Sequence, residues 1–265
     1  MRDRDHTIIL LAKTDILSDE CLFNAFYKTV TEERRRKTDK YRFPEDKYLS
    51  LGAEVLLYEA LNRFGFDRAA CKGGNLSFIT GENGKPYIEG HGNIFFNISH
   101  SGDYVMCAVS DREVGCDIQK MGDAQPDIAE RFFLPQEYEA IVSQPEEEMQ
   151  RKMFYRYWTL KESYLKVTGR GMSLPLDEFE IRTYDMTEPV TAELVSAKTE
   201  GCVTESAEEA SEAVKCKKQG GWFYFREFET DPEYCCAICI ADRTSDAKMQ
   251  TIDLRDLMLF SGKNS

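Results

Sequence analysis

The sequence predicts a fold of mixed helices and strands in two related halves. Residues 44–64 and 148–168 carry apolar side chains at the three- and four-residue spacing of a helix. Residues 76–118 instead alternate short apolar runs with glycine-containing turns, which favours strands. Tyr48-Leu-Ser-Leu in the first helix recurs as Tyr157-Trp-Thr-Leu in the second, and this faint echo indicates an internal repeat.

Local signals mark the expected elements of the first half. Pro44 suits the first position of a helix, and Gly65 suits its C-terminal end. The turn Ser101-Gly-Asp lies between two apolar runs and predicts a hairpin. The expected strands of this half are 7–12, 76–80, 94–98, 104–109 and 114–118.

The second half is predicted to begin with helices and to continue with strands. Its helical regions are 126–142 and 148–168, the latter ending at Gly169. Residues 190–219 have no aromatic side chain and are rich in glutamate, so we expect a long acidic loop there. The expected strands of this half are 178–184, 222–228 and 234–240.

The composition excludes several classes of protein. The 265 residues include 34 Lys and Arg against 47 Asp and Glu, which gives a net charge of −13 and disfavours general nucleic-acid binding. Hydrophobic residues at 42% argue against wholesale disorder. No stretch approaches the roughly 20 apolar residues that span a bilayer, and none resembles an export signal. We therefore expect a cytoplasmic protein that binds neither membrane nor nucleic acid.

The nine cysteines are interpreted as reduced thiols, because their number is odd and the chain lacks an export signal. Cys236 and Cys239 form a CxxC pair, but a zinc site normally needs four ligands and the sequence has no second pair. Since this pair lies in an apolar, strand-like run, we expect it to pack in the core.

Two segments at strand ends are suited to binding phosphate or metal. Asn97-Ile-Ser-His-Ser-Gly combines a hydroxyl group, an imidazole and a turn whose N–H groups can converge on an anion. Asp117 ends a short apolar strand, and Mg²⁺ prefers one or two carboxylates together with water and phosphate oxygens. A polar turn and a turn-capping aspartate are the alternative interpretations.

Two further segments supply charge. Glu162 and Lys166 are four residues apart, so they share one face of a mostly apolar helix, although a surface ion pair is the alternative. The basic run 34–42, together with Lys85, offers a docking place for a polyphosphate, although most of these charges could be simply solvated. The residues alone therefore indicate a Mg²⁺-dependent enzyme acting on phosphate esters.

Taken in order, these segments resemble the 4′-phosphopantetheinyl transferases of the Sfp type. The resemblance runs from about residue 20 to 182 and continues weakly to 240. Two flanking stretches, which begin at Arg131 and Gly169, also look like the family's sequence. The four matching motifs are Gly84-Lys-Pro-Tyr, Phe96-Asn-Ile-Ser-His-Ser-Gly, Val114-Gly-Cys-Asp-Ile and Trp158-Thr-Leu-Lys-Glu-Ser-Tyr-Leu-Lys.

The resemblance implies both a fold and a reaction. It implies an α+β pseudo-dimer of two similar halves, with the active-site cleft between them, and we expect the halves to be 1–117 and 118–265. The family moves the 4′-phosphopantetheine arm of coenzyme A onto a serine of an apo carrier protein and releases 3′,5′-ADP. The reaction depends on Mg²⁺.

The resemblance also assigns roles to individual residues. Asp117 and Glu162 would be the Mg²⁺ ligands, and Lys166 would contact the coenzyme A phosphates. Glu162, or a metal-bound water beside it, would be the general base. Many members carry a glutamate two residues after the motif aspartate, where this chain has Gln119, so a direct contact of Gln119 with the metal stays open. The implied coenzyme A site comprises Arg34, Lys37, Ser50, Lys85, Ser99, His100 and Lys166.

The implied partner is an apo acyl, peptidyl or aryl carrier protein of fatty acid, polyketide or nonribosomal peptide synthesis. We expect residues 119–130 to contact it and the enzyme to be a monomer. Two alternatives stay open at this point. One is a Mg²⁺-dependent phosphoesterase acting on coenzyme A-like ligands, and the other is a non-catalytic module that binds coenzyme A or the carrier.

Overall fold

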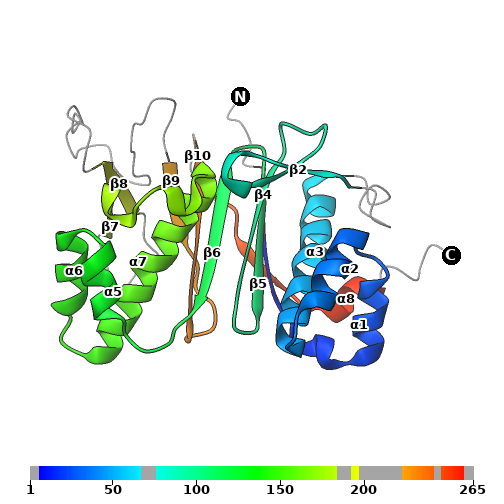
Figure 1. Cartoon of the computed structure of the whole chain (residues 1–265), viewed down its shortest axis with the longest axis horizontal. Coiled ribbons are helices and arrows are strands. Elements are labelled where there is room, and N and C mark those ends of the chain that lie inside the picture. The colour runs from blue at the N-terminus through cyan, green and yellow to red at the C-terminus, as the bar shows by residue number, and fades with distance from the viewer. Residues whose placement is uncertain (1–5, 67–75, 184–191, 197–222, 242–245, 260–265) are drawn as a thin grey trace. The chain divides into compact units, whose positions relative to one another are not determined.

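The computed structural model divides the chain into two compact units, which are described separately here (Figure 1). It describes residues 6–66, 76–183, 192–196, 223–241 and 246–259. The second unit comprises residues 112–245 together with the short turn 82–84, and all other residues belong to the first unit. That residues 1–117 and 118–265 are two related halves stays a prediction.

The first unit contains a four-stranded sheet in the order β11-β1-β5-β4. The β4–β5 and β5–β1 pairs are antiparallel, whereas β1 and β11 run parallel. The β4–β5 pair is the expected hairpin. The strands are β1 (Thr7–Lys13), β4 (Phe95–Ser101), β5 (Tyr104–Ser110) and β11 (Met249–Ile252).

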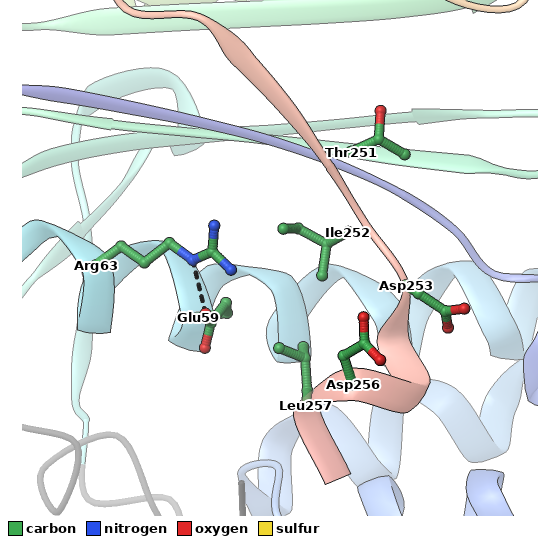
Figure 2. A pocket seen from close by; sticks show the side chains of 7 residues that line it. All are labelled: Glu59, Arg63, Thr251, Ile252, Asp253, Asp256 and Leu257. Atoms are coloured by element: carbon green, nitrogen blue, oxygen red, sulfur yellow. Dashed lines mark hydrogen bonds and ion pairs between the residues drawn. The ribbon is translucent and has the colours of Figure 1, made fainter. Parts of the chain in front are cut away.

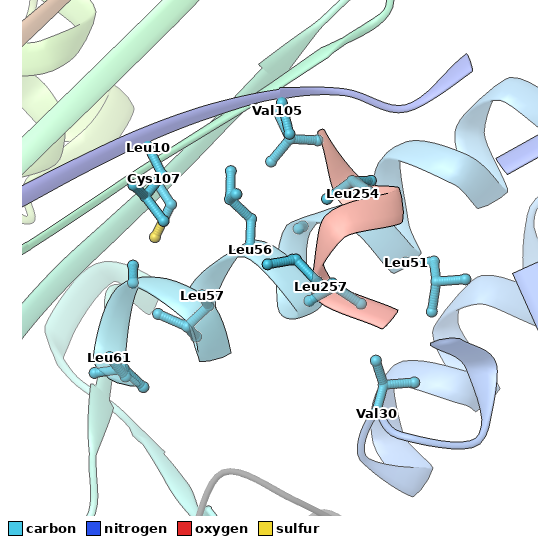
Figure 3. Packing of buried hydrophobic residues seen from close by; sticks show 14 of the residues in the cluster. Leu10, Val30, Leu51, Leu56, Leu57, Leu61, Val105, Cys107, Leu254 and Leu257 are labelled. Atoms are coloured by element: carbon cyan, nitrogen blue, oxygen red, sulfur yellow. The ribbon is translucent and has the colours of Figure 1, made fainter. Parts of the chain in front are cut away.

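One long helix, α3 (Pro44–Phe64), packs on this sheet. As expected from the sequence, α3 begins at a proline and ends at Gly65. Gly65 has a φ of 102°, a conformation that glycine adopts without strain. Leu56 and Leu57 of α3 lie among Leu10, Val105 and other buried apolar side chains of the sheet (Figure 3). Burial of this apolar surface is the main force that holds the helix in place.

Shorter elements complete the first unit. The helices are α1 (Glu20–Tyr27), α2 (Glu32–Lys40) and α8 (Leu254–Leu259), and the strands of a small hairpin are β2 (Phe78–Thr80) and β3 (Pro86–Ile88). The 3₁₀ turn η1 (Asp15–Ser18) also belongs to the first unit, whereas η2 (Glu82–Gly84) is the short turn of the second unit. The C-terminal pair β11 and α8 was not expected from the sequence.

The second unit is built on a three-stranded antiparallel sheet in the order β6-β10-β9. In the register of β6 and β10, Asp117 lies opposite Ala237. The strands are β6 (Val114–Lys120), β9 (Phe223–Glu227) and β10 (Tyr234–Ala241), and β7 (Phe179–Thr183) pairs separately with β8 (Ala192–Ser196).

A second long helix, α7 (Glu147–Thr168), packs on β6 and β10 (Figure 1). It ends, as expected, at Gly169, which has a φ of 64°. The expected helix 126–142 is two helices, α5 (Pro126–Phe132) and α6 (Pro135–Val142), because Pro135 cannot continue the first and starts the second. Two 3₁₀ turns, η3 (Gly171–Ser173) and η4 (Leu176–Glu178), follow α7.

The expected acidic loop 190–219 is described only in part. Residues 192–196 form the strand β8, and residues 190–191 and 197–219 lie outside the described residues. Cys236 and Cys239 are buried in β10, as core packing predicts. Within the described part of the chain, every helix falls short of the length and apolarity that crossing a membrane requires.

Candidate active site

Lys166 of α7 donates a hydrogen bond to Asp117 of β6 within the second unit. The distance from Nζ to Oδ1 is 2.6 Å. Asp117 is only 3% exposed, whereas the lysine side chain keeps 26% of its surface accessible. A carboxylate buried to this degree needs a positive partner, and the ammonium group supplies it.

Gly115 allows α7 to come close enough to β6 for this contact. A Cβ atom at Gly115 would lie 2.1 Å from the carbonyl oxygen of Ser163 and 2.5 Å from the backbone nitrogen of Val167. Gly115 and Asp117 lie on the same face of β6, because side chains alternate along a strand. The missing side chain therefore places the Ser163–Val167 turn of α7 directly against the face that carries Asp117.

Glu162 lies one helical turn before Lys166 and shares its face of α7. Its side chain is half-buried. Burial raises the pKa of Glu162, and the negative charge of Asp117 raises it further, whereas Lys166 acts in the opposite direction. Asp117 is thus close enough to Glu162 for its charge to act on this group.

The charge of Lys166 is stabilised by its acidic neighbours. Burial by itself would lower the pKa of Lys166, but the charges of Asp117 and Glu162 and the hydrogen bond to Asp117 outweigh it, so the pKa is raised. The ammonium form is therefore retained throughout the neutral range. Asp117, Glu162 and Lys166, which the sequence predicted to act together, are brought together by the fold.

The donor set of this cluster fits a hard divalent cation. Mg²⁺ binds carboxylate oxygens and retains water or phosphate oxygens for the remaining positions. Among the described residues, no group of three or more His, Cys, Asp or Glu side chains is placed to hold a metal, so two carboxylates are what this cluster offers. Gln119 lies two residues beyond Asp117 on the same face of β6 and is half-buried, and its neutral amide could add one carbonyl oxygen.

In the first unit, α2 and α3 bring Arg34 and Ser50 onto adjoining helices. The hydroxyl group of buried Ser50 lies 2.9 Å from that of Thr38, and Arg34 donates from Nε to Glu54 at 3.0 Å. Lys37 is exposed on the same short helix, α2. The helix α2, which carries most of the basic run, is therefore anchored to α3 by the Thr38–Ser50 and Arg34–Glu54 contacts.

Glu54 is a functional candidate that the sequence analysis missed. It is 3% exposed and accepts hydrogen bonds from the backbone and hydroxyl groups of Thr31, at 2.6 and 3.0 Å, and from Tyr58 at 2.7 Å. With Arg34, four donors converge on one carboxylate. The signal was present in the sequence, because an acid in the run Leu51-Gly-Ala-Glu-Val-Leu-Leu demands buried partners.

The remaining predicted residues lie elsewhere in the first unit. Ser99 and His100 are consecutive residues of β4, so their side chains point to opposite faces of the strand, with Ser99 buried and His100 exposed. Lys85 is buried just before β3, with Nζ 5.7 Å from the ring centre of Tyr87. That these three residues converge with Arg34 on one ligand stays a prediction.

A cavity of about 300 Å³ in the first unit is not this site (Figure 2). It lies between α3, β11 and α8, and none of the predicted site residues lines it. Its charged walls are Glu59, Asp253 and Asp256 against Arg63, which is ion-paired to Glu59. An excess of carboxylates disfavours a polyphosphate ligand.

Comparison with known sequences identifies the class of protein that carries this cluster. Residues 113–239 match the sequence model of the 4′-phosphopantetheinyl transferase superfamily, and residues 18–112 match that of the 4′-phosphopantetheinyl transferase N-terminal part. The chain belongs to the 4′-phosphopantetheinyl transferase superfamily.

Its relatives place it more narrowly. It is 34% identical to a 4′-phosphopantetheinyl transferase of Bacillus subtilis over 213 residues. These residues make up 80% of this chain and 82% of that protein. It is 30% identical over 217 residues to 4′-phosphopantetheinyl transferase Sfp of Bacillus subtilis strain 168, with coverage of 82% and 84%. The chain is thus an Sfp-type enzyme, as the resemblance implied, and the two matched parts agree with a fold of two halves.

Proposed function

We propose that Asp117, Glu162 and Lys166 form the centre at which this transferase moves the 4′-phosphopantetheine arm of coenzyme A onto a serine of an apo carrier protein. The observation that carries the proposal is the 2.6 Å contact between Lys166 and buried Asp117, with Glu162 one turn away on the same helix face. Two carboxylates and an ammonium group in one place suit a Mg²⁺–pyrophosphate complex.

The reaction makes a phosphodiester bond to serine and breaks the phosphoanhydride bond of the coenzyme A pyrophosphate. The carrier serine oxygen attacks the β-phosphorus of coenzyme A, the bond from that phosphorus to the bridging oxygen breaks, and 3′,5′-ADP leaves. We assign the serine proton to the Glu162 carboxylate or to a water molecule beside it, because this carboxylate lies one helical turn from Lys166 on the same face of α7. Asp117 and Glu162 would hold a divalent cation, which would supply electrophilic stabilisation of the pyrophosphate when bound.

Lys166 has two tasks in this proposal. Without substrate, its ammonium group neutralises Asp117. With coenzyme A bound, the accessible quarter of its side chain can turn to a phosphate oxygen, where positive charge stabilises the leaving group as it forms.

We assign the nucleotide end of coenzyme A to residues of the first unit. Arg34 and Lys37 lie on α2, which matches the need for positive charge at a 3′-phosphate. Glu54 binds Nε of Arg34 and thereby fixes the direction of its guanidinium group. The remaining residues of the proposed site are Ser50, Lys85, Ser99 and His100.

The partner in this proposal is an apo carrier protein, with which residues 119–130 make contact. This segment leads from the end of β6, next to Asp117, into α5. A carrier docked on it would present its serine near the proposed centre. We further propose that the enzyme acts as a cytoplasmic monomer.

The test is the intact mass of an apo carrier protein after incubation with the enzyme, coenzyme A and Mg²⁺. We expect a gain of one phosphopantetheine group, which chelation of the metal by EDTA abolishes. Hydrolysis of coenzyme A without a carrier would instead identify a phosphoesterase. Binding of coenzyme A that is independent of Mg²⁺, without turnover on several carriers, would identify a non-catalytic module.

A further inference from the structure

A completely buried ion pair lies beside the proposed centre. Lys161 of α7 and Glu137 of α6 are separated by 2.8 Å between Nζ and Oε2, with side chains only 0% and 1% exposed. Lys161 immediately precedes Glu162, yet it has no part in the reaction described above.

The three donors of the Lys161 ammonium group all have protein acceptors. Besides Glu137, Nζ donates to the carbonyl oxygens of Leu176 at 2.8 Å and Phe179 at 2.9 Å. The ring of Phe179 lies over the charge, with its centre 4.4 Å from Nζ. Lys161 therefore ties α7 to η4 and to the start of β7, and it is not accessible to a ligand.

Glu137 is held equally firmly. Its Oε2 accepts from the backbone nitrogen of Leu134 at 3.0 Å, and its Oε1 accepts from that of Ile181 at 2.8 Å. The pair thus joins four segments: the start of α6, the middle of α7, η4 and β7. Together these contacts form a rigid support on one side of α7.

The support lies opposite the contact with β6. Successive helix residues are rotated by about 100°, so Lys161 and Ser163 point about 200° apart, to opposite faces of α7. Ser163 lies against Gly115 of β6, and Lys161 is anchored to Glu137. These two contacts together fix the rotation of α7 about its axis. Glu162 lies between the two faces, so this rotation sets the direction in which the Glu162 side chain points.

Stability alone is a weak explanation for such a pair. Removing two charges from water costs more than most buried ion pairs return, and apolar replacements of both partners are often neutral or stabilising. We propose that Glu137 and Lys161 are positioning residues, which fix the rotation of α7 and so aim Glu162 and Lys166 at Asp117. This inference rests on the proposed function of those three residues.

The test is the double variant Glu137→Gln/Lys161→Met, which removes both charges at similar volume. We expect the double variant to stay folded with a lowered melting temperature, because no unpaired charge is left buried but the carbonyl oxygens of Leu176 and Phe179 lose their donor. We expect kcat of transfer to fall at least about tenfold, since a misdirected catalytic group costs this much or more. The coenzyme A dissociation constant, measured by calorimetry, should change less than about threefold, because the nucleotide end is assigned to other elements.

Arg156 and Glu227 provide a matched control. They form another ion pair of α7, to β9, with side chains 8% and 16% exposed. We expect Arg156→Met/Glu227→Gln to change the melting temperature while kcat stays within about twofold. Equal losses of kcat in both double variants would mean general loosening of α7 and would overturn the proposal.

Two results separate this inference from the proposed function. If wild-type protein transfers phosphopantetheine and the Glu137→Gln/Lys161→Met variant is folded with kcat within twofold of wild type, positioning is refuted and the function stands. If the double variant does not fold, Glu137→Asp, which keeps both charges but shortens the side chain that anchors Lys161, gives the same decision through its kcat once circular dichroism shows that it is folded. If wild-type protein transfers nothing to any carrier, the function itself fails.

Discussion

Ser163 of α7 passes so close to Gly115 of β6 that a Cβ atom on Gly115 would lie 2.1 Å from the Ser163 carbonyl oxygen. No side chain fits in this space, and the atoms on the other side are backbone atoms of a long helix, which cannot rotate away. The helix and the strand that carry the three proposed catalytic residues are therefore in direct backbone contact.

This contact predicts the effect of Gly115→Ala. The added methyl group must push α7 away from β6, which costs about 1–3 kcal/mol of stability through overpacking. It also widens the gap between Lys166 and Asp117, so kcat should fall by at least about tenfold. Thermal melts and transfer kinetics check both effects. The control is Gly92→Ala, where a Cβ atom meets nothing within 4 Å and both quantities should stay at wild-type values. An active, fully stable Gly115→Ala enzyme would show that the close approach is unimportant.

The buried carboxylate of Glu54 leads to a second prediction. In Glu54→Gln, an amide group replaces an acceptor for four hydrogen bonds, and its own N–H groups face donors, so stability should fall by about 1–3 kcal/mol. Because Arg34 loses its partner, KM for coenzyme A should rise while kcat changes little. Urea unfolding and steady-state kinetics measure these effects.

Glu59→Gln on the same helix is the control for Glu54. It removes a more exposed i, i+4 pair with Arg63, a type of contact worth about 0.3–0.5 kcal/mol. We expect little change in either measurement. A Glu54→Gln enzyme with unchanged KM would argue against a role of Arg34 in binding coenzyme A.

A third prediction concerns thiol reactivity and its dependence on pH. Burial raises the pKa of Cys235 to about 12 and raises that of Cys236 as well, whereas Cys21 is exposed on α1. Since only the thiolate reacts, roughly one molecule in 10⁴ carries a reactive Cys235 at pH 8, and this fraction rises tenfold per pH unit. Iodoacetamide at pH 8 should therefore label Cys21 well before Cys235 or Cys236. Peptide mass spectrometry over time measures the order, and early labelling of Cys235 would contradict the buried environment.

Local sequence signals predicted the two long helices and the hairpin for clear physical reasons. Pro44, Gly65 and Gly169 stand where the helices begin or end, and each acts through its own backbone geometry. The split of 126–142 at Pro135 was also readable from the sequence, and we missed it.

Other features depend on the folded chain and have weak local signals. The parallel pairing of β11 with β1 joins residues about 240 positions apart through a four-residue strand. The Glu137–Lys161 pair likewise becomes visible only when α6 and α7 are packed together. Of the proposed site, Asp117, Glu162 and Lys166 were predicted as a group, whereas the supporting Gly115 and Glu54 were not.

The most direct measurement is the rate at which an apo carrier protein gains phosphopantetheine with wild-type, Asp117→Asn and Glu162→Gln enzymes at saturating Mg²⁺. The control is Glu229→Gln, an exposed carboxylate of the second unit. We predict that both cluster variants lose about a hundredfold or more in kcat, as expected when a preorganised charge at the reacting phosphate is removed, while the control keeps wild-type activity. Near-normal transfer by Asp117→Asn or Glu162→Gln, with a melting temperature like that of the wild type, would contradict the placement of the reaction at this cluster.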